Sequence, residues 1–181
     1  MQHVDPLVAE LIDSLPTTPA VVTNERFDVI ASNALARAVS PSLTAGVNLA
    51  EATFVNLSAR ETLPRWSEVS VRMIELLKEA VADPDPVGPD AERFAELRAE
   101  LTLRSTAFEI AWRNGTLPSS YALDVSMDHP HVGRLEITYE LLRLPDSRQL
   151  VVMGHTVPGS ESEQRLFWLA AHSETVPRRP M

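Results

Sequence analysis

The sequence contains no cysteine, which excludes disulfide bonds, thiolate metal ligands and a cysteine nucleophile. It has only six glycines, and they never form the cluster that cradles a phosphate, so we expect no nucleotide-binding loop. Neither an HExxH metalloprotease motif nor a G-x-S-x-G hydrolase motif occurs. We therefore predict no catalytic residue, no bound metal, no cofactor and no enzymatic activity.

Basic residues and long apolar runs are also scarce. Sixteen basic residues against 25 acidic ones leave a formal charge of −9, which repels phosphates and makes this chain alone a poor binder of DNA or RNA. No apolar run approaches the roughly 20 residues that cross a bilayer. Residues 1–15 lack the basic flank and the apolar core of a signal peptide. We expect a cytoplasmic protein with no membrane partner.

What the chain does contain is enough apolar residues for one core. Its 181 residues are 44% hydrophobic and 23% charged, as in an ordinary globular protein. Every connection between the expected elements is short. We therefore predict one domain over residues 1–174, followed by a flexible tail over residues 175–181.

The stretch 128–160 has the clearest pattern, that of two long antiparallel strands joined at Pro145-Asp146-Ser147. Polar residues alternate with apolar ones in the first strand, which indicates one buried and one wetter face. The apolar positions are Leu135, Ile137, Tyr139 and Leu141. The second strand, residues 150–154, is apolar on both faces, which is typical of a strand near the middle of a sheet.

The remaining elements complete an α+β domain. Apolar spacing and capping residues predict helices at 7–15, at 33–39, from Ser58 to about Ala82, from Asp90, from Ser105 to Asn114, and after Ser160. Pro64 can split a short segment from the long helix. Further strands are expected at 20–23, 27–32 and 121–127, a loop at 46–56 with buried anchors Leu49 and Phe54, and a helix-free connection at 83–89.

This order predicts a five-stranded antiparallel sheet with a helical block on one face and flanking terminal helices. It is also the order of a PAS domain, which holds a small ligand between its sheet and its helices. Aromatic residues on the helical stripes either fill the core or line such a cavity together with Met73 and Leu77. The candidate ligand-binding residues are Asn33, Phe54, Arg60, Trp66, Met73, Leu77, Phe108, Trp112, Leu123, Tyr139 and Met153.

Several polar residues have two interpretations. Arg60 is either a surface charge, paired with Glu61 or Glu68, or a clamp for a ligand carboxylate. Asn33 is primarily a helix cap, with a pocket role as the alternative. His129 and His131, which share one face of a strand, could begin a metal site, but no third ligand has a recognisable spacing, and a structural turn role is the alternative. His155 is interpreted as a sheet histidine rather than a catalytic base.

Ordered fragments through most of the chain resemble the ligand-binding domain of MmyB-like transcription regulators. They are Pro19-Ala20, Phe27-Asp28-Val29, Asn33-Ala34, Asn48-Leu49, Phe54, Ala59-Arg60-Glu61, Trp66, Leu97 to Leu101, Ser105, Phe108, Trp112, His129-Pro130-x-Val132-Gly133-x-Leu135, Tyr139, Leu142-Arg143-Leu144-Pro145-Asp146, Gln149-Leu150 and Pro158-Gly159-Ser160. Each fragment is weak by itself, but their combination over roughly residues 5 to 172 is specific.

This resemblance implies a PAS-like domain that follows a helix-turn-helix domain of the phage-repressor type and binds a fatty-acid-like ligand in some members. No helix-turn-helix precedes Asp5, so the chain is either separated from its DNA-binding domain or a stand-alone sensor. The chain also has Ala31-Ser32-Asn33 where the family more often carries a tryptophan before the asparagine, so the family's pocket shape does not transfer.

Three functions remain in view. The first is a homodimeric regulatory domain that binds an apolar or amphipathic small molecule and contacts DNA only through a helix-turn-helix domain outside this chain. The second is a structural dimerisation module in which the aromatic residues are simply core. An enzyme that uses His129 or His155 is the third, and no motif supports it.

Overall fold

The structure, a computed structural model, describes residues 4–82, 89–115, 121–145 and 147–173. Its strands are β1 (Ala20–Asn24), β2 (Val29–Ser32), β3 (Ala122–His129), β4 (Gly133–Arg143) and β5 (Gln149–His155). Its helices are α1 (Pro6–Asp13), α2 (Ala34–Val39), the 3-10 helix η1 (Pro41–Leu43), α3 (Leu49–Phe54), α4 (Leu57–Glu61), α5 (Trp66–Ala82), α6 (Pro89–Arg104), α7 (Thr106–Asn114) and α8 (Glu161–His172). Most of the expected connection at 83–89 and the expected tail lie outside the described residues.

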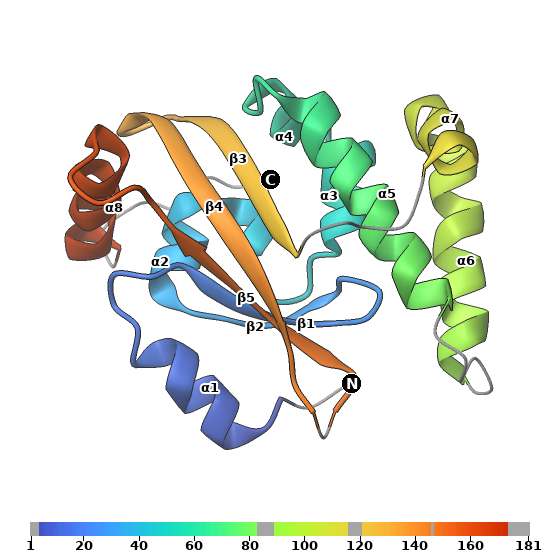
Figure 1. Cartoon of the computed structure of the whole chain (residues 1–181), viewed down its shortest axis with the longest axis horizontal. Coiled ribbons are helices and arrows are strands. Elements are labelled where there is room, and N and C mark those ends of the chain that lie inside the picture. Colours follow the sequence, from blue (N-terminus) through green and yellow to red (C-terminus); the bar gives the residue numbers. More distant parts are fainter. Residues whose placement is uncertain (1–3, 83–88, 116–120, 146, 174–181) are drawn as a thin grey trace.

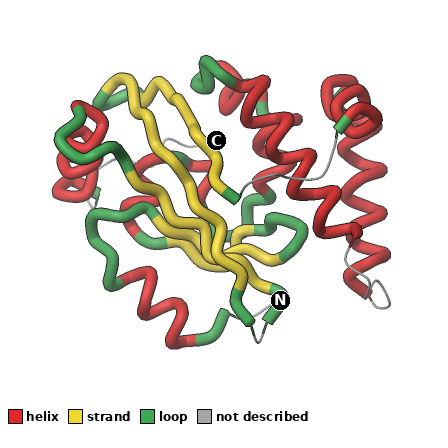
Figure 2. The backbone as a smooth tube through the Cα atoms, viewed as in Figure 1, coloured by secondary structure: helices red, strands yellow, loops and turns green. Residues whose placement is uncertain are grey.

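The five strands form one antiparallel sheet in the order β2-β1-β5-β4-β3 (Figures 1 and 2). The N-terminal hairpin β1–β2 joins the C-terminal strands through the pairing of β1 with β5, in which Val21 faces Val152. Strand β5 is paired on both sides and covered on both faces. Its side chains are therefore buried on both faces, which explains its continuous apolar run. The predicted α+β, PAS-like fold class is confirmed.

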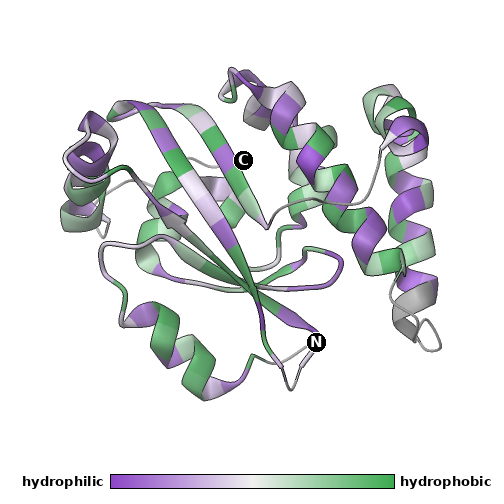
Figure 3. Cartoon of the chain, viewed as in Figure 1, coloured by the Kyte–Doolittle hydropathy of each residue, from purple (hydrophilic) through white to green (hydrophobic). Residues whose placement is uncertain are grey.

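The two faces of the sheet carry separate apolar clusters. The larger cluster includes the predicted buried face of β4 and is covered by the helices between β2 and β3, together with α8. The smaller cluster, around Ile12, Val22 and Val151, is covered by α1 on the opposite face. Figure 3 shows the alternation of hydrophobic and hydrophilic residues along β4 that separates a buried face from a wetter one.

Capping side chains fix where the helices begin, as the sequence predicts for four of them. Asp5 accepts from the N–H of Leu7 at the start of α1, where Pro6 occupies the first position. The other N-caps are Asn33 for α2, Ser105 for α7 and Ser160 for α8. Among the described helices, none has both the length and the apolar character needed to cross a membrane.

Two expectations for residues 46–82 are wrong. The segment 46–56 is not only a loop, because Asn48 accepts from the N–H groups of Ala50 and Glu51 and starts α3. Ser58 does not begin the long helix, since α4 begins one residue earlier and ends at Glu61. Pro64 lies in the break between α4 and α5, because proline has no backbone N–H to donate to a helical hydrogen bond. The predicted splitting of the helix is confirmed.

Candidate functional site

Four of the predicted pocket aromatics meet in one place, which we call the ring cluster: Phe54, Trp66, Phe108 and Trp112. Phe54 makes edge contacts with Phe108 and Trp66, with ring centroids 5.1 and 6.0 Å apart. Phe108 stacks on Trp112 at 5.6 Å and is 0% exposed. The cluster joins the end of α3, the start of α5 and one face of α7, so these three helices are held together by ring packing.

Cations cover the outer sides of the two tryptophans. The guanidinium of Arg60 lies 4.0 Å from the ring of Trp66, whose indole N–H donates to the carbonyl of Thr53 at 2.7 Å. Lys78 and Arg98 lie 5.5 and 5.9 Å from the ring of Trp112. Such contacts stabilise an exposed aromatic face by about 0.5–1 kcal/mol each.

Arg60 thus lies at the rim of the ring cluster, where it stacks on the ring of Trp66. Its expected partner Glu68 pairs instead with Arg65 at 3.5 Å. Arg60 is exposed on the short helix α4, six residues before the ring on which it lies. The guanidinium of Arg60 therefore contacts an aromatic face rather than a carboxylate.

On the sheet side, Leu123 of β3 and Tyr139 of β4 are register partners and contribute to the same larger cluster. Tyr139 is also opposite Gly154 of β5. A Cβ at Gly154 would lie 2.9 Å from the ring of Tyr139, so the glycine makes room for that ring. Burial raises the pKa of the Tyr139 phenol. Met73 and Leu77 are buried on α5, which packs against β3, α3 and α7.

Two of the candidate residues lie elsewhere. Met153 packs in the smaller cluster on the α1 face, so it lies on the opposite side of the sheet from the other candidates such as Met73 and Phe108. Because β5 is apolar on both faces, the sequence alone did not distinguish the two sides. Asn33 is 3% exposed, and its side chain binds backbone groups of α1, β1 and α2. Its helix-cap role is therefore the one that the structure describes.

Two hollows between described residues lie away from the ring cluster. The first, which we call the α5 crevice, has apolar lining residues Phe27, Leu76, Ala80, Leu141 and Leu150 and polar ones Glu25, Glu79, Tyr121 and Arg143. Its free space is only about 10 Å³, close to the volume that one water molecule needs. A larger ligand therefore requires α5 and the sheet to separate.

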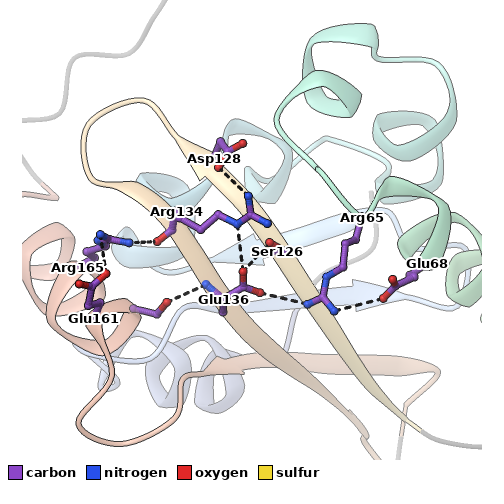
Figure 4. A network of polar contacts seen from close by, with 9 residues as sticks. Arg65, Glu68, Ser126, Asp128, Arg134, Glu136, Glu161 and Arg165 are labelled. Carbon is purple, nitrogen blue, oxygen red and sulfur yellow. Dashed lines mark hydrogen bonds and ion pairs between the residues drawn. The ribbon is translucent and has the colours of Figure 1, made fainter.

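The second hollow is an open groove of about 340 Å³ beside the first turn of α8. Among its lining residues is Glu136, which accepts from Ser126 at 2.7 Å and pairs with Arg134 and Arg65, both at 3.1 Å (Figure 4). Partial burial opposes ionisation of Glu136, but these donors and cations outweigh it and lower its pKa. Ser162 of α8 accepts from the Glu136 N–H at 2.9 Å. This network ties α5 and α8 to the outer face of the sheet.

The histidine pair has a structural role. His129 is buried, and its Nε2 lies 2.9 Å from the carbonyl oxygen of Ala38, while its Nδ1 is 3.3 Å from the N–H of His131. Both ring nitrogens are thus occupied by backbone groups. Among the residues that the structure describes, no three His, Cys, Asp or Glu side chains gather in a way that could hold a metal ion.

Sequence reasoning missed the polar residues around the α5 crevice. Tyr121 donates to Glu79 of α5, and Arg143 at the end of β4 lies 3.9 Å from both Glu79 and Glu25. These residues come from four separate segments and carry no motif. The one available signal was Tyr121, which begins the alternating pattern of β3 but remains 48% exposed.

A PAS-like sheet closed by a helical block with an aromatic interior has the architecture of a ligand-binding domain. The chain belongs to the MmyB-like transcription regulator ligand binding domain family, whose model matches residues 4–169. This membership assigns the domain a ligand-binding role in a transcription regulator. No curated protein matched the chain.

Proposed function

We propose that this domain senses an elongated apolar or amphipathic molecule, fatty-acid-like in its chemistry, that binds between the sheet and the helical block. The observation that carries the proposal is the family match over residues 4–169. The ligand would contact Phe54, Trp66, Met73, Leu77, Phe108, Trp112, Leu123 and Tyr139, which line the common interior of the larger cluster.

Binding requires the interior to open, since the rings of the cluster are in mutual contact. A ligand that binds only the opened arrangement shifts the population toward it by its difference in affinity for the two arrangements. Helix α5 is the element best placed to respond, because it carries Trp66 at its start and Met73 and Leu77 at its buried face.

The response would reach DNA through a helix-turn-helix domain outside this chain. We propose that the domain acts as a homodimer and that movement of α5 or of the terminal helices changes the spacing of two paired DNA-binding domains. The formal charge of −9 is compatible with DNA binding by a separate domain, because the ligand-binding domain itself does not need to approach phosphates.

Native mass spectrometry and lipid extraction of the purified protein test the proposal. We expect a bound acyl molecule, or stoichiometric binding of added dodecanoate that changes the fluorescence of Trp66 and Trp112. Leu123→Phe, which narrows the interior from the sheet side, should weaken binding by roughly tenfold. Met153→Phe is the matched control, since Met153 is also half-buried but lies on the opposite face.

The filled interior also favours a second candidate, a structural dimerisation module with no physiological ligand. It predicts that neither extraction nor titration finds an acyl molecule, and that disruption of α1 or α8 abolishes the dimer. Equal effects of Leu123→Phe and Met153→Phe on dodecanoate binding would likewise contradict an internal binding site.

A further inference from the structure

The α5 crevice lies where the last two turns of α5 meet the end of β4 and the start of β5. Its inner wall is apolar, with Leu76 from the helix facing Leu141 and Leu150 from the sheet. Phe27, in the turn before β2, closes its base with an unusual positive φ of 64°. A non-glycine residue holds this conformation only when its surroundings require it, and here the ring is buried at 2% exposure.

A set of polar residues, which we call the latch, spans the mouth of this crevice: Glu25, Glu79, Tyr121 and Arg143. Arg143 is 48% exposed and lies 3.9 Å from the carboxylates of both Glu25 and Glu79. The Tyr121 hydroxyl donates to Glu79, and this hydrogen bond raises the pKa of the phenol. The latch therefore joins α5 to the β1–β2 turn, to the start of β3 and to the end of β4.

The latch is weakly held. Ion pairs at 3.9 Å between partly exposed side chains contribute little and are screened by salt. Arg148 also pairs with Glu25 at 3.4 Å, so two cations balance two carboxylates at the mouth. Because these charges balance, the mouth attracts neither anionic nor cationic ligands strongly from a distance. Each charged group of the latch can nevertheless exchange its ion-pair partner for the polar group of an incoming ligand.

A buried hydroxyl behind the crevice lacks a hydrogen-bond partner. Thr23 of β1 is 0% exposed, and its Oγ1 finds no acceptor or donor among the described residues. Thr23 is the register partner of Leu150, so its side chain lies on the same face of the sheet as the crevice wall. A molecule or a water that entered here would satisfy that hydroxyl, which an apolar interior leaves unpaired.

The crevice borders the interior where the ligand is proposed to bind, because its lining residue Leu76 belongs to the larger cluster. Leu76 lines the crevice, and Met73 and Leu77 are neighbouring buried positions on the same helix. An outward movement of the C-terminal half of α5 would widen the crevice and loosen the packing around Met73 and Leu77 at the same time.

From these observations we infer that the α5 crevice is the portal through which the ligand reaches the interior, and that the latch is its gate. The inference rests on the proposed function, because a portal needs an internal site. The molecule that passes has a narrow apolar chain, which fits between Leu76 and the sheet, and a polar end that exchanges partners with the latch.

Single cysteines provide the direct test, because the natural chain has none. Leu141→Cys places a thiol in the crevice wall, and Ile137→Cys places one on the same face of the same strand, away from the crevice. A maleimide should label Leu141→Cys about threefold faster when Glu79→Gln and Tyr121→Phe open the latch, since such contacts are individually weak. Ile137→Cys should not respond.

Glu100→Gln is the control for a lost surface charge pair, because Glu100 pairs with Arg104 on α6 at 2.6 Å. It should leave both labelling rates unchanged. An unchanged rate for Leu141→Cys in the latch variant, or an equal rise for Ile137→Cys, overturns the portal, since the second result means general loosening.

Stopped-flow mixing with dodecanoate separates the two proposals. A gate affects the path, so the latch variant should take up and release dodecanoate faster by a similar factor while its Kd changes little. If the wild-type protein binds dodecanoate but the latch variant has unchanged rates, the portal is wrong and the sensor stands. If the wild-type protein binds no dodecanoate, both proposals fall.

Discussion

At the scale of single residues, Thr23 illustrates how an unpaired group lowers stability. Its hydroxyl is removed from water on folding but gains no partner among the described residues. A buried polar group without a hydrogen bond costs about 1–3 kcal/mol. The position suits a β-branched residue, because Thr23 lies within β1 and is paired on both sides.

We predict that Thr23→Val raises the free energy of unfolding by about 1 kcal/mol, since the methyl group fills the same space without a desolvated hydroxyl. Urea denaturation measured by circular dichroism tests this. Thr53→Val is the control, because the Thr53 hydroxyl donates to the carbonyl of Leu49 at 2.7 Å and its loss should not stabilise the protein. A destabilised Thr23→Val would mean that the hydroxyl has a partner in solution.

His129 is a second residue whose environment has a measurable consequence. Burial lowers its pKa below the ordinary value of 6.5, and the nearby His131 acts in the same direction, while the hydrogen bond to Ala38 opposes them. The folded state therefore binds the proton less readily than the unfolded state. Stability from this group is complete above pH 6.5 and is lost as the pH falls through the lowered pKa.

We predict that the free energy of unfolding decreases between pH 7 and pH 5, and that His129→Gln makes this profile flatter. Glutamine can still donate to the carbonyl of Ala38 but does not titrate. Chemical denaturation at several pH values measures the slope. His155→Gln is the control, since the side chain of His155 is 60% exposed, and an equal flattening by this variant would contradict the assignment.

At the scale of elements, Asn33 connects three of them. Its Nδ2 lies within hydrogen-bonding distance of the carbonyls of Ile12, Leu15 and Thr18, at 3.0, 3.2 and 2.8 Å. Its Oδ1 accepts from the N–H groups of Ala20 and Ala36, at 3.2 and 2.9 Å. One side chain thus caps α2 and fixes the end of α1 against the first strand.

We predict that Asn33→Ala lowers the free energy of unfolding by roughly 3 kcal/mol, because it removes a helix cap and leaves buried backbone groups unpaired. Asn33→Asp keeps the acceptor but turns a carboxylate toward three carbonyls, so it should be destabilising at pH 7 and less so near pH 4. Thermal unfolding measures both. If Asn33→Ala lowered the free energy of unfolding by less than about 0.5 kcal/mol, as substitutions of exposed residues usually do, this role would be contradicted.

Elements with a strong periodic pattern were predictable from the sequence, and so was the short helix α2, because the cap Asn33 was recognised. The alternation from Leu135 to Leu141 defined β4, and Pro64 located the break before α5. Helix α3 was missed because six residues show no clear period, and only Asn48 marked its start. The ring cluster was predicted from helical stripes, whereas the face of Met153 depends on strand register, which no local pattern determines.

At the scale of the whole molecule, helices α5, α7 and α6 pack one on the next, and not each of them directly on the sheet. Helix α7 packs on α5, and α6 packs on α7 through Phe94 and Trp112, whose rings are 6.5 Å apart (Figure 1). Leu103 on α6 is 88% exposed and Ile110 on α7 is 57% exposed. Where its burial is described, α6 has only Leu101 fully buried, with Phe94 and Leu97 half-buried, so little burial stabilises this helix.

We predict that backbone amides of α6 exchange with deuterium at least about a hundredfold faster than those of β5, which is the difference that about 3 kcal/mol of local stability produces. Hydrogen exchange with mass spectrometry measures this. Addition of a bound ligand should slow exchange in α5 and α7 more than in α1, which lies on the opposite face. Uniform exchange over α6 and β5 would show that the domain opens only as one unit.

The central position of β5 has a consequence for how the protein is made. Val152 is synthesised about 130 residues after its partner Val21, and β4 on the other side also depends on β5. Until the ribosome releases β5, the hairpin β1–β2 has an unpaired edge and the two halves of the sheet remain separate. The sheet therefore cannot be completed until β5 is released, and the edge of β1 stays unpaired throughout synthesis of the helical block.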